Sequence, residues 1–217
     1  MERAFGLEIP TTLEEFCDPR RTALLVYDMQ AGIVPQLPNG AEITARVARV
    51  LAAAREGGYR VFFTRHMGLP HAVAGVTQLR TAMAWQHVDH VAKTKAHFLR
   101  DSAEFQLVPE LAPSPDEAVF DKLAMSAFVG TPLDVALRDC GILAFVIVGI
   151  ALEVGIEPTI RHATDLGYVP IAVMDACGWR DPDAARRARE QLAFAGGSFQ
   201  TTTDVIVPLL RKSASIG

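Results

Sequence analysis

The stretch LAFVIVGIALEVGIEPTIRHATDLGYVPIAVM (143–174) contains the pattern that decides the fold. It begins with the apolar run Leu143–Val148 and ends with a second apolar run, Tyr168–Met174. Runs that are hydrophobic on both faces are typical of strands buried inside a parallel sheet. Between them, Glu153–Leu166 has a helical pattern that stops at Gly167. The stretch therefore predicts a β-α-β unit, in which a helix joins two parallel strands.

The same alternation continues on both sides of this unit. Four more segments have strand character: Ala23–Tyr27, Tyr59–Thr64, Ala118–Phe120 and Phe199–Thr202. Three more have helical character: Ala41–Glu56, Pro132–Asp139 after Thr131, and Asp183–Ala195 after the predicted N-cap Asp181. The segment 85–105 is polar and is predicted to be a surface segment or helix. We therefore expect the α/β class, with a doubly wound, mostly parallel sheet of six strands and helices on both faces.

Composition narrows the class of protein further. At 217 residues and 23.5 kDa the chain predicts one domain over 1–217, because a domain has about 150 residues. Hydrophobic residues make up 50% and charged residues 21%, which excludes a disordered chain. The 21 Lys plus Arg against 25 Asp plus Glu argue against a nucleic-acid-binding protein, which needs a basic face.

Three features predict a cytoplasmic protein that has no membrane partner. No apolar run approaches the roughly 20 residues that span a bilayer. Acidic residues stand near the N-terminus, where a secretory signal has an apolar block. An odd number of cysteines (Cys17, Cys140 and Cys177) is typical of a reducing compartment. The tail Lys212–Gly217 is small and polar and is expected to fray.

Polar residues stand where several predicted strands end. Ligands of such sheets bind outside the carboxyl ends of the strands, which directs attention to Asp28, His66, Lys122 and the segment 175–178. Asp28 alone is equally consistent with a loop-ordering carboxylate, and a lone Lys122 with a surface lysine. Together they are informative, because the ends of the first and third strands can bring them into one crevice. A nearby ammonium stabilises a carboxylate, which can then exchange protons with a substrate.

The turn after the fourth strand, Gly149–Ile156, leads into a helix. Backbone N–H groups at a helix N-terminus suit an oxyanion or a carboxylate. On turn chemistry alone, a plain connection between strand and helix is the better interpretation.

Four segments together resemble the isochorismatase-like hydrolase superfamily, which includes nicotinamidases, N-carbamoylsarcosine amidohydrolases and isochorismatases. They are TALLVYDMQ (22–30), FDKLAMSAFVGTPLDVALRDCGI (120–142), VIVGIALEVGIEPTIRHATDLGYVPIAVMDACG (146–178) and, more loosely, GGSFQTTTD (196–204). The resemblance implies a Rossmann-like three-layer α/β/α fold and catalytic roles for Asp28 and Lys122. It also implies a cis peptide near Ile150–Ala151 that helps to shape an oxyanion site.

The chain departs from the family pattern at Gly155. Most members carry a nucleophilic cysteine at this position, and glycine has no side chain that forms a thioester. Cys177 follows a strand at the correct edge, but a free cysteine is more often a small buried hydrophobe. Glycine here resembles the isochorismatase branch, in which an Asp protonates the methylene carbon of a vinyl ether and water captures the oxocarbenium. Tyr27 and Leu152-Glu153 differ from the His and Ala-His that are usual in that branch.

Further residues are candidates for the oxyanion or substrate-binding site. They are Ile150, Ala151, Gly155, Gln30, His66, Phe128 and Trp85. Trp85 is equally consistent with helix packing. His66 and His71 lie in one loop, but two histidines without a carboxylate are a weak metal signal, so we expect no metal and no cofactor.

These observations predict a hydrolase that uses acid–base chemistry on a small anionic metabolite, with an isochorismate-type vinyl ether as the first candidate substrate. Two alternatives stay open: a non-catalytic binding or regulatory relative, and an amidohydrolase with an atypical nucleophile. The expected partners are a small-molecule substrate and further copies of the chain. The resemblance is to oligomeric proteins, and the apolar content favours a homo-oligomer, a dimer or tetramer.

Overall fold

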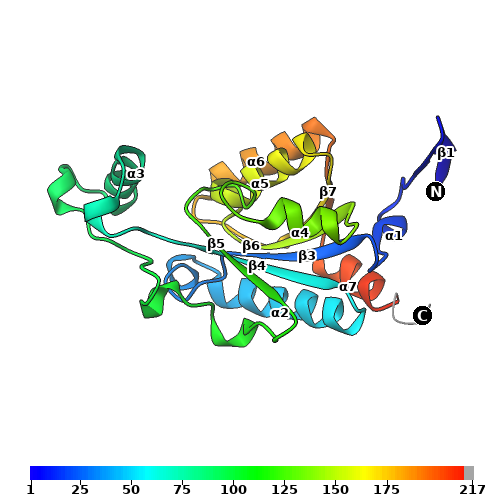
Figure 1. Ribbon diagram of the computed structural model, residues 1–217, viewed down its shortest axis with the longest axis horizontal. Coiled ribbons are helices and arrows are strands. Elements are labelled where there is room, and N and C mark those ends of the chain that lie inside the picture. The colour runs from blue at the N-terminus through cyan, green and yellow to red at the C-terminus, as the bar shows by residue number, and fades with distance from the viewer. Residues whose placement is uncertain (213–217) are drawn as a thin grey trace.

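The protein is built around a six-stranded sheet in the order β5-β4-β3-β6-β7-β8, in which every strand pair is parallel (Figure 1). The computed structural model describes residues 1–212. The predicted frayed tail therefore lies outside the described residues, except for Lys212. The strands are β3 (Thr22–Tyr27), β4 (Arg60–His66), β5 (Ala118–Lys122), β6 (Ala144–Ile150), β7 (Val169–Gly178) and β8 (Phe199–Thr201). Every residue of β3 and β6 is buried. All six strands predicted from the sequence are therefore confirmed.

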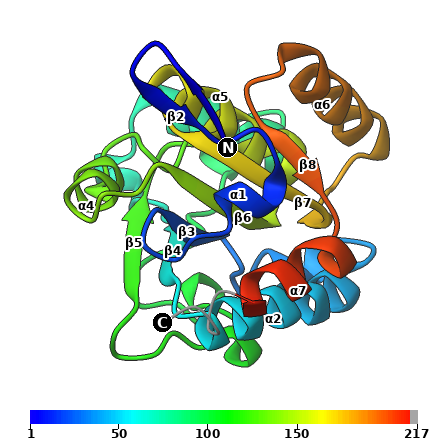
Figure 2. The same ribbon diagram turned by 90° about the vertical axis from the view of Figure 1, so that its right-hand side faces the viewer.

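Helices cover both faces of the sheet. On one face lie α2 (Gly40–Glu56) and α7 (Thr203–Lys212), which pack side by side (Figure 2). On the other face lie α4 (Leu133–Asp139), α5 (Glu157–Asp165) and α6 (Pro182–Ala195) (Figure 1). The predicted N-cap of α6 is confirmed, because an Asp181 carboxylate oxygen accepts a hydrogen bond from the Ala184 N–H at 2.6 Å. The predicted three-layer, doubly wound architecture is therefore confirmed.

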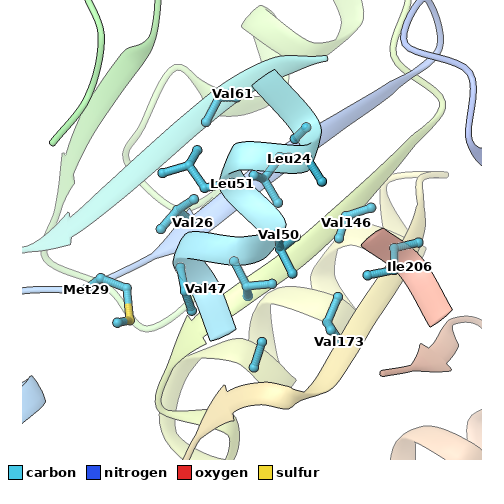
Figure 3. Packing of buried hydrophobic residues seen from close by; sticks show 14 of the residues in the cluster. Leu24, Val26, Met29, Val47, Val50, Leu51, Val61, Val146, Val173 and Ile206 are labelled. Atoms are coloured by element: carbon cyan, nitrogen blue, oxygen red, sulfur yellow. The ribbon is translucent and has the colours of Figure 1, made fainter. Parts of the chain in front are cut away.

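The apolar stripe of α2 forms the core on its side of the sheet. Val47, Val50 and Leu51 pack against strand residues that include Leu24 and Val146, all of them almost fully buried (Figure 3). Each such side chain contributes roughly 1.5–3 kcal/mol when it is removed from water. This packing holds α2 against the middle of the sheet.

The segment predicted as the helix Glu153–Leu166 divides into two parts. It begins as a π-helical turn, η6 (Leu152–Ile156), and continues as α5. In the turn, the Ala151 carbonyl accepts hydrogen bonds from the N–H groups of Val154, Gly155 and Ile156. Single π turns of this kind are rare and occur frequently at functional sites.

Several elements were absent from the sequence-based prediction. The N-terminus forms a hairpin of β1 (Glu2–Ala4) and β2 (Leu7–Ile9), followed by α1 (Leu13–Phe16). Helix α7 contains Pro208, which resembles a helix breaker in the sequence. Short 3-10 turns lie at η1 (Val34–Gln36), η2 (His71–Val73), η3 (Val91–Lys93), η4 (Ala103–Phe105) and η5 (Pro109–Leu111).

Helix α3 (Val76–Gln86) projects from the body on an arm that follows β4 (Figure 1). None of its residues is buried. The predicted surface segment 85–105 starts at the end of this helix and is exposed or half-buried except at Thr94 and Phe105, which are buried. No helix within residues 1–212 is long and apolar enough to cross a membrane. Homo-oligomer formation stays a prediction.

We expect Leu24→Ala to lower the free energy of unfolding by about 2–5 kcal/mol, because it leaves a cavity in the core between β3 and α2. The side chain of Leu24 is 1% exposed. Val135→Ala is the control, since Val135 is 70% exposed on α4 and should change stability by about 0.5 kcal/mol or less. Urea unfolding measures both, and equal losses would contradict the assigned core.

Candidate active site

The carboxyl ends of the central strands surround a small cavity of about 70 Å³. Its wall includes Tyr27 and Asp28 after β3, His66 at the end of β4, and the turn that follows β6. The cavity shares His66, Trp85 and Arg180 with a larger groove of about 750 Å³ that extends along α3. A small reacting group therefore fits beside Asp28 while the rest of a molecule occupies the groove.

Asp28 and Lys122 form a buried ion pair at this edge of the sheet. Lys122 Nζ lies 2.6 Å from Asp28 Oδ2, and the Lys122 side chain has no exposed surface. The other carboxylate oxygen, Oδ1, accepts a hydrogen bond from Thr64 Oγ1 at 2.7 Å. The pairing follows from the sheet, because β4 lies between β3 and β5 and His66 is in register with Lys122. Residues 94 positions apart therefore meet, as the strand-end argument predicted.

The buried position makes the proton of Lys122 easier to move. Burial lowers the pKa of Lys122, and the attraction of Asp28 opposes this effect. Lys122 Nζ also lies 3.3 Å from the Ala124 carbonyl and 4.3 Å from the centre of the Tyr27 ring. Because burial destabilises the ammonium, Lys122 gives up its proton more readily than a lysine in water does. The pair can therefore supply a proton to the cavity or accept one from it.

The turn after β6 contributes backbone and no nucleophile. The Ile150–Ala151 peptide bond is cis, at the position that the family resemblance implies. The N–H of Gly155 donates to Ala151, as do those of its two neighbours, so these three N–H groups are not available to an oxyanion. Gly155 lines the cavity and brings no side chain to it.

The cysteines do not supply the missing thiol. Cys177 is 1% exposed, and burial raises its pKa to about 12. A thiol with that pKa forms almost no thiolate at neutral pH. None of Cys17, Cys140 and Cys177 lines the cavity or the groove. An amidohydrolase that uses Cys177 as its nucleophile is therefore disfavoured.

The structure brings some of the predicted binding residues together and separates others. Ile150, Ala151, His66 and Trp85 lie in the cavity wall with Gly155. Burial lowers the pKa of His66, so its ring is neutral at neutral pH.

Two predicted binding residues lie outside both cavities, and their assignment is corrected here. Gln30 is fully buried, and its amide is occupied by the backbone: Nε2 donates to the His66 and Phe105 carbonyls, and Oε1 accepts from the His66 N–H. Phe128 packs against Tyr168 and other aromatic rings in the core. Gln30 therefore holds the loops of the site, and Phe128 supports the helix layer.

Sequence reasoning missed Arg180. This residue lies two positions after the end of β7 and lines both the cavity and the groove. Within residues 1–212 its guanidinium forms no ion pair. Its backbone is held by Glu153, whose Oε1 accepts hydrogen bonds from the N–H groups of Arg180 and Asp181. The rule that ligands bind outside the carboxyl ends of the strands would have identified Arg180 if the candidate segment after β7 had extended from Gly178 to residue 180.

The hydrogen bond to the Arg180 N–H also explains why an acid, Glu153, stands in the turn after β6. Glu153 points toward the β7–α6 loop and is absent from the lining of the cavity and the groove. In the part of the chain that the structure describes, Asp28 is the only carboxylate that lines either space. No three His, Cys, Asp or Glu side chains among these residues form a group that could hold a metal ion.

Comparison with known proteins places this geometry in a family. The model of the isochorismatase domain matches residues 22–204. The chain is 30% identical over 188 residues to the ureidoacrylate amidohydrolase RutB of Pantoea ananatis, covering 78% of this chain and 74% of that protein. It is 29% identical over 201 residues to the RutB of Methylobacterium radiotolerans, covering 84% and 77%. A crystal structure of a cysteine hydrolase from Pseudomonas syringae pv. phaseolicola matches with a TM-score of 0.75 and 27% identity, over 90% of this chain and 95% of that one. The chain therefore belongs to the isochorismatase family of hydrolases.

Proposed function

We propose that this protein hydrolyses a small carboxylate-bearing substrate by acid–base chemistry, without a covalent enzyme intermediate. The observation that carries the proposal is the buried Asp28–Lys122 pair, of which Asp28 lines a cavity whose wall contains no cysteine. A protein that only binds a ligand has no need of both charges, and a buried ion pair is weak evidence of a stabilising role, because the cost of desolvation offsets the attraction.

The first candidate bond is a vinyl ether. Asp28, protonated by Lys122, donates a proton to the methylene carbon and leaves an oxocarbenium ion. Water adds to that cation and returns a proton to Asp28, and the resulting hemiketal breaks into pyruvate and an alcohol. No step requires a nucleophilic side chain, so Gly155 is compatible with the whole sequence.

The second candidate bond is an amide or ureide C–N bond, which the names of the RutB relatives favour. Here the Asp28 carboxylate accepts a proton from water, and the water oxygen attacks the carbonyl carbon. The leaving nitrogen then receives that proton. Ammonia release distinguishes this route from the first.

The charges around the cavity favour an anionic substrate. Arg180 lines both spaces, and Lys95 lies along the groove. Guanidinium groups bind carboxylates through two parallel hydrogen bonds, which fixes the orientation of the bound group. Together with Asp28 as the single acid, this arrangement supports a substrate whose carboxylate faces Arg180 and whose reacting bond faces Asp28.

The proposal is tested by incubating purified protein with isochorismate and, separately, with ureidoacrylate, and by measuring pyruvate and ammonia. We expect one product to form and Asp28→Asn to reduce kcat by at least about 100-fold, because the amide cannot exchange the proton. Asp116→Asn, on the exposed surface, is the control and should retain wild-type kcat. Ligand binding without release of either product would instead support the non-catalytic alternative and overturn the proposal.

We expect Arg180→Gln to raise KM for the anionic substrate about ten-fold, with a smaller change in kcat, because a charge-assisted hydrogen bond to the substrate is lost. Arg60→Gln is the matched control, since Arg60 is exposed at the opposite end of the sheet. Steady-state kinetics measure both variants. An unchanged KM in Arg180→Gln would show that the substrate carboxylate lies elsewhere.

A further inference from the structure

Tyr27 occupies the space that a side chain at residue 155 needs. A Cβ atom at Gly155 would lie 2.0 Å from the Tyr27 hydroxyl oxygen and 2.5 Å from Cζ of the ring. Such distances are far below van der Waals contact, and the ring cannot move away easily because Tyr27 is only 1% exposed. A cysteine at residue 155 and Tyr27 in its present position therefore exclude each other.

The Tyr27 hydroxyl also lies at the reacting end of the site. Tyr27 follows directly before Asp28 and lines the same cavity. Its ring lies against Lys122 Nζ, and its hydroxyl donates a hydrogen bond to the Met125 carbonyl. Met125 lines the cavity as well, so a substrate atom that enters there competes with its carbonyl for the phenolic hydrogen.

The phenol stays protonated in this environment. Burial and, next, the charge of Asp28 raise the pKa of Tyr27 well above its usual value. A phenol in this state is a hydrogen-bond donor and not a nucleophile. It therefore does not replace the thiol in a covalent mechanism.

We propose that Tyr27 is a catalytic residue that uses the space of the absent thiol to donate a hydrogen bond to the heteroatom of the bond that is cleaved. This inference rests on the proposed function of the site. Asp28 transfers the proton. Tyr27 stabilises the negative charge that develops on the leaving oxygen when the hemiketal breaks down, or on the leaving nitrogen when an amide bond is cleaved. The exchange of a thiol for a phenol changes the site from covalent to non-covalent hydrolysis.

We expect Tyr27→Phe to reduce kcat about 100-fold and to change KM by less than about two-fold, because a donor aimed at developing charge acts mainly in the transition state. Tyr168→Phe is the matched control. It also removes a buried hydroxyl, one that hydrogen-bonds to Asp134, but Tyr168 does not line the cavity, so kcat should stay within about two-fold of wild type. Thermal unfolding of both variants separates a loss of donor from a loss of folding.

The outcomes for Tyr27 and for the proposed function are distinguishable. If wild type turns over a substrate and folded Tyr27→Phe retains more than half of its kcat, the role of Tyr27 is overturned and the proposed function stands. If wild type releases no product, the proposed function is overturned, and calorimetric titration with oxalate, a small carboxylate, then tests the donor alone. Oxalate should bind Tyr27→Phe at least five-fold more weakly than Tyr168→Phe. Equal affinity, or no binding to wild type, overturns the role of Tyr27.

The steric exclusion gives a second test, which does not depend on activity. We expect Gly155→Ala to lower Tm by roughly 5 °C, because the methyl group overlaps the Tyr27 ring. In a Tyr27→Ala background the same substitution should lower Tm by less than half as much, since the ring is gone. Equal losses in the two backgrounds would show that Tyr27 does not occupy the side-chain space of residue 155.

Discussion

The buried ion pair between Lys122 and Asp28 is the constraint on which the site depends. Removal of either partner leaves an uncompensated charge inside the protein, which is strongly unfavourable. The pair therefore needs three adjacent strands in correct register, because β4 supplies Thr64 to one Asp28 oxygen and separates the two charged residues in the sheet. The hydrophobic packing of α2 and the helices on the opposite face keeps those strands in place. Stability and chemistry are thus linked through one 2.6 Å contact.

Around that pair, the site is built from backbone that other side chains hold. Gln30 connects the end of β4 to the loop that contains Phe105, and Glu153 connects the turn after β6 to the loop after β7. Neither side chain lines the cavity. Their role is to position His66 and Arg180, which do. Polar residues at strand ends can therefore be structural supports of a site as well as parts of it.

Gly155 and Tyr27 are coupled by packing, because the Tyr27 ring occupies the space that a side chain at residue 155 needs. Gly155 brings no nucleophilic side chain to the cavity. The Tyr27 phenol fills the side-chain space of residue 155 and, because its pKa is raised, is a hydrogen-bond donor and not a nucleophile. The ion pair of Asp28 and Lys122 lies beside them, with Lys122 Nζ against the Tyr27 ring. The Tyr27 ring thus occupies the side-chain space of residue 155, although the two residues are 128 positions apart in the sequence.

The sequence by itself determined the six strands, the main helices and the meeting of Asp28 with Lys122. Apolar runs indicate strands that are buried on both faces of the sheet. The carboxyl ends of parallel strands lie at the same edge of the sheet, which brings the residues that follow them together. The absence of a thiol at Gly155 was also readable directly. The tertiary structure decided the rest, because packing and side-chain direction depend on residues distant in sequence. It placed Gln30 and Phe128 outside the cavity and turned Glu153 away from it, toward the Arg180 backbone. It also put the Tyr27 ring in the volume of a residue 155 side chain, which no local pattern in either segment encodes.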